Sequence, residues 1–205
     1  MIIGIDFDNT IVSYDEIFYE EALSRGLIRS GTEKRKMVVR DNIRKLPDGD
    51  IEWQKLQAVA YGQRMKEARI ISGVREFLRT CAINNIMFYI ISHKTEFANY
   101  AETKINLRSE AIGWLKNKGF FKSNEFDFSL NNLYFAFTRP EKIEYIKQLK
   151  CTHFIDDLEE TFLDASFPVN VNKILFNKSC KNASLKDISV FSKWEHITKH
   201  LFHEN

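Results

Sequence analysis

The first residues of the chain contain the pattern that most constrains its fold. The run from Ile2 to Phe7 is apolar except for Asp6, and Asp8 follows it directly. Side chains at positions i and i+2 of a strand point to the same side, so we expect Asp6 and Asp8 to emerge together where a buried strand ends. Two carboxylates beside an apolar strand are costly unless a cation compensates their charge, and Mg²⁺ is a hard cation that binds carboxylate oxygens. The segment therefore predicts a strand that ends at a metal site.

Apolar runs of strand length alternate with helical patterns through most of the remaining sequence. Residues 86–91 are continuously apolar, which is typical of a fully buried strand. Further strands are expected at 133–137, 153–155 and 171–176, and helices at 74–83, 95–106, 109–118, 141–150 and 190–202. Such alternation predicts an α/β protein with a Rossmann-like three-layer α/β/α core around a parallel sheet.

Residues 14–70 depart from this alternation and contain no predicted strand. Helical spacing of apolar residues is found in 14–27 and again in 51–68. We therefore expect a helical insert at 14–70 within a core made of 1–13 and 71–205. The basic residues between Arg25 and Lys45 favour a solvated helix face, and the alternative is a surface that attracts an anionic substrate.

Composition excludes several classes of protein. The chain has 205 residues and a formal net charge of +2, which gives no reason to expect nucleic acid as a partner. Cys81, Cys151 and Cys180 are widely spaced, so neither a zinc site nor a disulfide framework is indicated. No signal peptide precedes the first strand, and no apolar stretch is long enough to span a membrane. We expect a soluble, cytoplasmic protein with reduced cysteines.

Polar residues follow four of the expected strands. They are Asp6 and Asp8, Ser92, Lys142 at the start of a helix, and Asp156 with Asp157. Ligands of open parallel sheets bind outside the carboxyl ends of the strands, so these residues should converge. In order and spacing the set resembles the haloacid dehalogenase superfamily, whose members are mostly phosphatases. Residues 14–70 then occupy the place of a helical cap of the C1 type.

The resemblance implies a role for each of these residues. Asp6 is expected to be the nucleophile that forms an aspartyl-phosphate, and Asp8 the general acid and base. Mg²⁺ would be held by Asp6, the Asp8 backbone carbonyl and Asp157, with Asp156 as a more distant ligand. Phosphoryl oxygens would be bound by Ser92 and Lys142, with Thr10 and His93 as further phosphate-binding residues. Dehalogenases of the superfamily lack an acid at the position of Asp8, which favours phosphoryl transfer here.

Each of these residues also has a purely structural interpretation. Asp156 and Asp157 are suitable N-cap residues for a helix beginning near Leu158. Ser92 is equally suited to cap a following helix, and His93 to orient a loop. Lys142 has two rivals for the phosphate site, Arg139 and Lys147, of which Lys147 lies further from the start of the helix.

The expected function is Mg²⁺-dependent hydrolysis of a phosphomonoester, with a small phosphorylated metabolite such as a sugar phosphate or a nucleotide as substrate. One alternative is a phosphomutase, which would transfer the phosphoryl group to a second hydroxyl. Another is a polynucleotide-end phosphatase, whose binding to oligonucleotides would weaken with salt. A third is a non-catalytic binding protein that retains the fold. Release of orthophosphate by the wild type and its loss in Asp6→Asn would separate the hydrolase from the phosphomutase and from the non-catalytic protein.

Overall fold

A computed structural model describes residues 1–100, 103–122, 125–126, 128–178 and 187–202. The chain divides into two compact units. Unit 1 contains Met1–Val12, Ile70–Lys94 and Gly119–Asn205, and unit 2 contains Ser13–Arg69 and Thr95–Lys118. The division adds residues 95–118 to the insert that the sequence predicts. The function of unit 2 as a cap stays a prediction.

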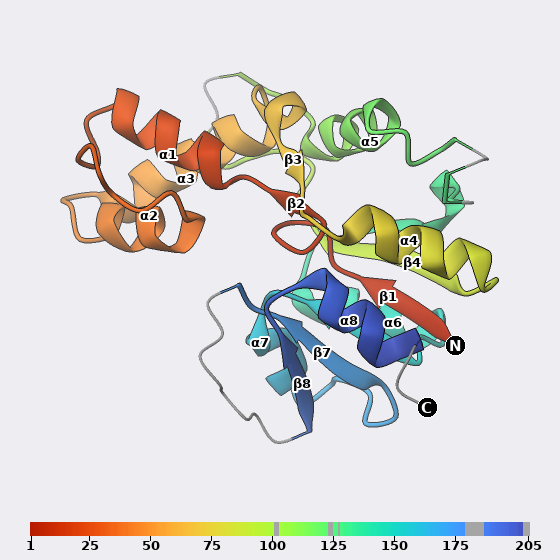
Figure 1. Ribbon diagram of the computed structural model, residues 1–205. Helices are drawn as coiled ribbons and strands as arrows, with labels where there is room; N and C mark the ends of the chain where they lie inside the picture. Colours follow the sequence, from red (N-terminus) through yellow and green to blue (C-terminus); the bar gives the residue numbers. More distant parts are fainter. Residues whose placement is uncertain (101–102, 123–124, 127, 179–186, 203–205) are drawn as a thin grey trace. The chain divides into compact units, whose positions relative to one another are not determined.

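Unit 1 is built on a six-stranded sheet in which all neighbouring strands are parallel (Figure 1). In spatial order the strands are β5 (Leu133–Ala136), β4 (Met87–His93), β1 (Ile2–Ile5), β6 (His153–Asp156), β7 (Asn172–Phe176) and β8 (Ile188–Phe191). Because the strands are parallel, their carboxyl ends lie at one edge of the sheet. The predicted α/β fold with a parallel sheet is confirmed.

Strand β1 lies between β4 and β6, which makes it a central strand. Ile3 and Ile5 are fully buried, as the apolar pattern predicts. Gly4 is required here, because a Cβ atom at this position would lie 2.6 Å from the Phe154 ring on β6. A larger residue at position 4 would therefore force the Phe154 ring to shift.

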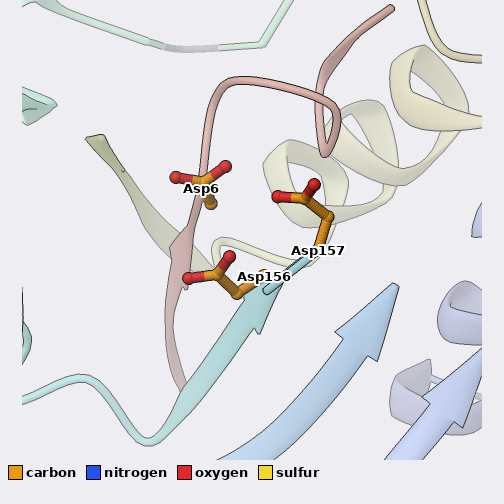
Figure 2. Close-up of side chains that lie close together, drawn as sticks. All are labelled: Asp6, Asp156 and Asp157. Atoms are coloured by element: carbon orange, nitrogen blue, oxygen red, sulfur yellow. The ribbon is translucent and has the colours of Figure 1, made fainter. Parts of the chain in front are cut away.

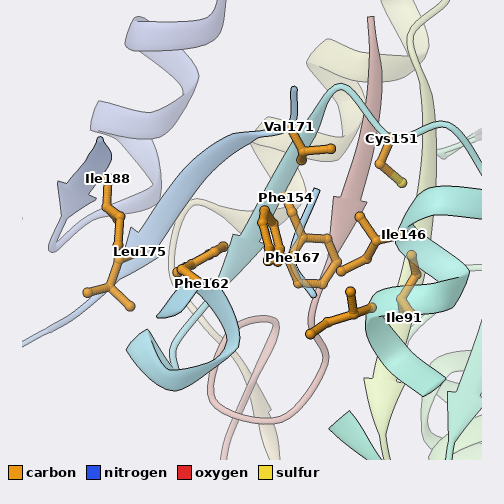
Figure 3. Packing of buried hydrophobic residues seen from close by; sticks show 10 residues of the cluster. Ile91, Ile146, Cys151, Phe154, Phe162, Phe167, Val171, Leu175 and Ile188 are labelled. Atoms are coloured by element: carbon orange, nitrogen blue, oxygen red, sulfur yellow. The ribbon is translucent and has the colours of Figure 1, made fainter. Parts of the chain in front are cut away.

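Helices cover both faces of this sheet, which gives the three layers (Figure 1). On one face, α6 (Arg139–Gln148) and α7 (Glu159–Leu163) supply Ile146 and Phe162, which pack with Ile91 and Phe154 of the sheet (Figure 3). On the other face are α4 (Val74–Ile83) and α8 (Trp194–Phe202), whose aromatic rings meet each other and Phe176 of β7. Alternate residues of the strands thus fill two separate core layers.

Unit 2 is helical in its described residues. It contains α1 (Asp15–Ser24), α2 (Lys36–Ile43), α3 (Gly49–Tyr61), the short 3₁₀ helix η1 (Met65–Glu67) and α5 (Leu107–Asn117). The Phe18 ring stacks on Trp53 with 4.5 Å between centroids, so α1 packs against α3. The Trp114 indole of α5 donates a hydrogen bond of 2.9 Å to the Ala68 carbonyl. This contact explains why α5 belongs to the same unit as the 13–69 segment.

Two predicted helices differ from the structure. The described part of residues 95–106 contains no helix. The next helix, α5, begins directly after Asn106, whose side chain caps it by accepting hydrogen bonds from the Arg108 and Ser109 amides. The expected helix at 190–202 starts later, at Trp194, and residues 188–191 form strand β8 instead. At the boundaries between the units, β2 (Val12–Ser13) pairs with β3 (Arg69–Ile70). A 3₁₀ helix, η2 (Leu130–Asn132), precedes β5.

The structure describes two of the three cysteines and all the helices of unit 1 and unit 2 named above. Cys81 and Cys151 are free and buried, while Cys180 lies outside the described residues. Among the helices of the described residues, none is both apolar enough and long enough to traverse a bilayer. Burial raises the pKa of each of the two described thiols to about 12, so neither thiol ionises at neutral pH.

Candidate active site

The loop after β1 holds the first two acids on a tightly turned backbone. The amides of Ile11 and Val12 both donate to the Phe7 carbonyl, at 3.0 and 3.1 Å, and the Asn9 amide donates to the Val12 carbonyl at 2.8 Å. Asn9 has a φ of 64°, a left-handed conformation that asparagine tolerates better than most residues. The turn therefore fixes the backbone immediately after Asp6.

Three carboxylates meet beyond the ends of β1 and β6 (Figure 2). Asp6, Asp156 and Asp157 each place an oxygen within 4.8 Å of the others, and this is a possible metal-binding group among the described residues. Asp6 is 5% exposed and Asp156 is fully buried. Carboxylates so close together and out of water need compensating cations.

Lys142 supplies one of these cations from the first turn of α6. Its ammonium group donates to Asp6 Oδ1 at 2.6 Å and to Asp156 Oδ2 at 2.8 Å. The helix begins at Thr138, whose hydroxyl accepts from the Glu141 amide, and this N-cap brings Lys142 to the carboxyl edge of the sheet. Its sequence rival Lys147 is exposed and pairs with Glu144.

The protonation of this group follows from burial and charge. Burial raises the pKa of Asp6 to about 7, with Lys142 opposing the rise and Asp156 adding to it. Burial lowers the pKa of Lys142, but the neighbouring charges of Asp156 and Asp6 more than offset this, so that its pKa is raised overall. Lys142 therefore stays charged at neutral pH, and one lysine does not fully compensate the acids around it.

Asp8 is held apart from the three clustered acids by a second lysine. Lys94 Nζ lies 2.8 Å from Asp8 Oδ2 and 3.1 Å from Oδ1, and the lysine is 4% exposed. The sequence interpretation missed Lys94, although one signal was present. Lys94 lies two residues after Ser92, and strand alternation places such a residue on the same side.

Ser92 and Thr10 differ in how their hydroxyl groups are used. Ser92 Oγ is buried and has no hydrogen-bond partner among the described residues. Because Ile5 pairs with Ile90 in register, Ser92 lies on the strand next to the loop that carries Asp6 and Asp8. The Thr10 hydroxyl instead donates to Asp6 Oδ2 at 3.2 Å. A buried hydroxyl group without a hydrogen-bond partner destabilises the folded protein unless a ligand supplies that partner. A bound phosphoryl oxygen, as the sequence predicts here, would be such a ligand.

The remaining predicted site residues are His93, Asp156 and Asp157. His93 Nε2 lies 2.8 Å from the Phe137 carbonyl on the exposed end of β4, so the structure gives it a loop contact and its phosphate-binding role stays a prediction. Asp156 Oδ1 accepts from the Leu158 amide at 3.0 Å, but Leu158 is itself the N-cap of α7 and no side chain caps that helix, so the predicted capping by Asp156 and Asp157 is wrong. Asp157 Oδ2 accepts from the Asn9 side chain at 3.2 Å.

The overall charge of the site fits a divalent cation. Four carboxyl groups, those of Asp6, Asp8, Asp156 and Asp157, lie around the ammonium groups of Lys94 and Lys142. The site therefore holds more acids than cations of the protein. The available donors are all oxygens, which Mg²⁺ prefers.

Comparisons with known proteins show that the fold of this chain is similar to that of several solved structures. Neither a family model nor a curated protein sequence matches the chain. Among solved structures, a haloacid dehalogenase-like hydrolase from Streptococcus pneumoniae is 13% identical with a TM-score of 0.61, and each chain is covered to 97%. A hydrolase of the same family from Deinococcus radiodurans, solved with bound phosphate and sodium, is 16% identical with a TM-score of 0.57 over 98% of this chain and 94% of that one.

A third similar structure has a different description. Protein tyrosine kinase A from Mycobacterium tuberculosis is 13% identical with a TM-score of 0.66, and the match covers 98% of this chain and 97% of the kinase. At identities this low the likeness shows a shared fold. Activity has to be argued from the site itself.

Proposed function

We propose that this chain, which has the fold of haloacid dehalogenase-like hydrolases, is a Mg²⁺-dependent phosphomonoester hydrolase that acts through an aspartyl-phosphate at Asp6. Its substrate would be a small phosphorylated metabolite, such as a sugar phosphate or a nucleotide. The observation that carries the proposal is the separation of the acids. Asp6 lies with Asp156, Asp157 and Lys142, whereas Asp8 is paired with Lys94.

The cation would be held by Asp6, Asp157 and the backbone carbonyl of Asp8. Asp156, which already accepts from Lys142 and from the Leu158 amide, would support it from a greater distance. When bound, Mg²⁺ neutralises carboxylate charge and polarises a phosphoryl oxygen.

The protein groups divide the chemistry between them. The Asp6 carboxylate attacks phosphorus, and the bond from phosphorus to the ester oxygen breaks. Asp8 gives its proton to the departing oxygen and then takes a proton from the water that hydrolyses the acyl phosphate. Ser92 Oγ and Lys142 Nζ are positioned to donate to phosphoryl oxygens, where negative charge increases during transfer.

The alternatives retain the same residues and differ in the acceptor or substrate. A phosphomutase would pass the phosphoryl group from Asp6 to a second hydroxyl, and a polynucleotide-end phosphatase would require a nucleic-acid surface. The basic residues of unit 2 give little support to the latter, because Arg25, Arg35, Arg40 and Arg44 are paired with neighbouring acids. Asp8 supports phosphoryl transfer over carbon–halogen cleavage, in which the leaving halide needs no proton.

The test is a screen of the purified chain against phosphorylated metabolites, with Mg²⁺ and with a chelator. We expect orthophosphate release that requires the metal and that falls at least about a thousandfold in Asp6→Asn, because the nucleophile is removed. Asp164→Asn, which changes a partly exposed acid of unit 1 outside the acidic cluster, serves as the matched control. Metal binding with no release of phosphate from any compound would overturn the hydrolase assignment.

A further inference from the structure

The charge pairing around Asp8 has no role in the mechanism described so far. Lys94 contacts both carboxylate oxygens of Asp8, at 2.8 and 3.1 Å, and lies almost entirely out of water. Its Nζ atom also lies 5.8 Å from the centroid of the Phe7 ring, the residue between the two acids. Burying a charged lysine is costly, and an ion pair of this kind often adds no stability over apolar residues of similar volume.

The backbone of Lys94 is held as firmly as its side chain. Its amide donates to the Ala136 carbonyl at 3.0 Å, which continues the pairing of β4 with β5 beyond His93. The ammonium group is therefore presented from a sheet edge. A charged group on a rigid element can fix the orientation of a partner that lies on a loop.

The two lysines divide the four acids into separate groups. Lys142 bridges Asp6 and Asp156, which belong with Asp157 to the three-acid cluster. Asp8 is only two residues from Asp6, yet its carboxylate contacts Lys94 and is not part of that cluster. Without Lys94, this carboxylate would be attracted to the cations of the cluster, which are Lys142 and any metal ion bound there.

We infer that Lys94 is a positioning residue that keeps the Asp8 carboxyl group away from the cation site and directed toward the ester oxygen. The inference rests on the proposed function, which it deepens. A carboxylate oxygen has two lone pairs, so an ammonium group that donates to it leaves a lone pair free to carry a proton, whereas metal coordination would tie the carboxyl group to the cation site. Lys94 thus separates the acid that transfers protons from the acids that hold metal.

The consequence depends on the leaving group of the ester. When the phosphorus–oxygen bond breaks, its electron pair stays on the ester oxygen, and that oxygen takes the Asp8 proton. An alkoxide is strongly basic and needs this proton, whereas 4-nitrophenolate leaves without it. Loss of Lys94 should therefore slow hydrolysis of an alkyl ester much more than hydrolysis of an aryl ester.

The experiment compares wild type, Lys94→Met and Lys94→Arg on ethyl phosphate and on 4-nitrophenyl phosphate. We expect Lys94→Met to lower kcat for ethyl phosphate at least about tenfold more than kcat for 4-nitrophenyl phosphate, with KM unchanged for both. Lys94→Arg should recover part of the loss, because it retains the charge. Lys147→Met removes an exposed lysine of unit 1 and should change neither ester. If Lys94→Met does not fold, Lys94→Gln provides the same comparison.

A second measurement separates positioning from direct binding of phosphate. The affinity for inorganic phosphate in the presence of Mg²⁺, measured by calorimetry, should be the same within about twofold in wild type and Lys94→Met. Equal losses of kcat on the two esters, or phosphate binding weakened more than about tenfold, would overturn the inference while leaving the hydrolase proposal intact. A wild type that hydrolyses neither these esters nor any metabolite of the screen overturns both.

Discussion

The two units of this chain place their charged residues in opposite ways. In unit 2, Arg25, Arg40 and Arg44 form ion pairs with nearby acids, and each pair is at least partly reached by water. In unit 1, Lys142 and Asp156 are paired almost completely out of water. Both arrangements are ion pairs, but only the buried one removes charges from solvent.

This difference indicates which charges serve the fold and which serve a site. Exposed ion pairs typically contribute about 0–1 kcal/mol, so the surface pairs of unit 2 need no special explanation. A buried pair costs several kcal/mol per ion in lost hydration, and an apolar replacement of similar volume is often as stable. The buried charges of unit 1 are thus best explained by chemistry at the sheet edge.

The largest expected effect is that of Lys142→Met. Removing this ammonium group leaves Asp6 and Asp156 without their shared partner, and we expect the metal-free protein to lose about 3–5 kcal/mol of its free energy of unfolding at pH 8. Chemical denaturation of wild type and variant measures this loss. The matched control is Lys147→Met, for which we expect a change within about 0.5 kcal/mol. A loss for Lys142→Met no larger than that of the control would remove the distinction between the units.

The pH dependence of stability provides a second test. The pKa of Asp6 is raised from 3.8 to about 7, chiefly by burial, so the folded state binds its proton more tightly than the unfolded state. The stabilisation from this proton is complete below about pH 4 and is lost as the pH rises to about 7, with a slope of at most about 1.4 kcal/mol per pH unit. Chemical denaturation of the metal-free wild type and Asp6→Asn at several pH values isolates this contribution.

The difference between the two proteins is the quantity to follow, because other groups titrate equally in both. We expect the wild type to lose stability relative to Asp6→Asn between pH 4 and pH 7. A difference in stability that stays constant across that range would contradict the conclusion that burial raises the pKa of Asp6.

The smallest effect is expected in unit 2. Arg64 pairs with Glu20 at 2.6 Å, and its pKa is raised, chiefly by its hydrogen bond with Glu67. Arg64→Gln should cost about 0.5–1 kcal/mol at low salt and less at high salt, because exposed pairs are screened. Thermal unfolding at two salt concentrations measures this. A cost that approaches that of Lys142→Met would show that the units do not differ as described.

Much of the candidate site could be predicted because strands place polar residues in a regular way. Asp6, Ser92 and Asp156 each end or follow an apolar run, so parallel pairing alone brings them to one edge. Lys142 could be selected over Lys147 because only the first turn of a helix reaches that edge.

The features that the sequence did not reveal depend on contacts between distant residues. Lys94 pairs with Asp8, which is 86 positions away in the sequence, and no local sequence pattern indicates such a pair. The predicted helix at 190–202 overlaps the end of strand β8, Ile188–Phe191, because this strand is short and its pairing with β7 comes from tertiary structure. The predicted helix at 95–106 ends on Asn106, the residue whose side chain caps α5 in the structure.

The central claim is that Asp6 becomes covalently phosphorylated. The most direct measurement is to mix the protein with Mg²⁺ and a hydrolysed ester, quench the reaction in acid, and determine the mass of the peptide that contains Asp6. We predict an added phosphoryl group on Asp6, in larger amount in Asp8→Asn, where activation of the hydrolytic water is lost. Continued phosphate release by Asp6→Asn, or turnover by the wild type with no phosphoryl group on this peptide, would contradict the account.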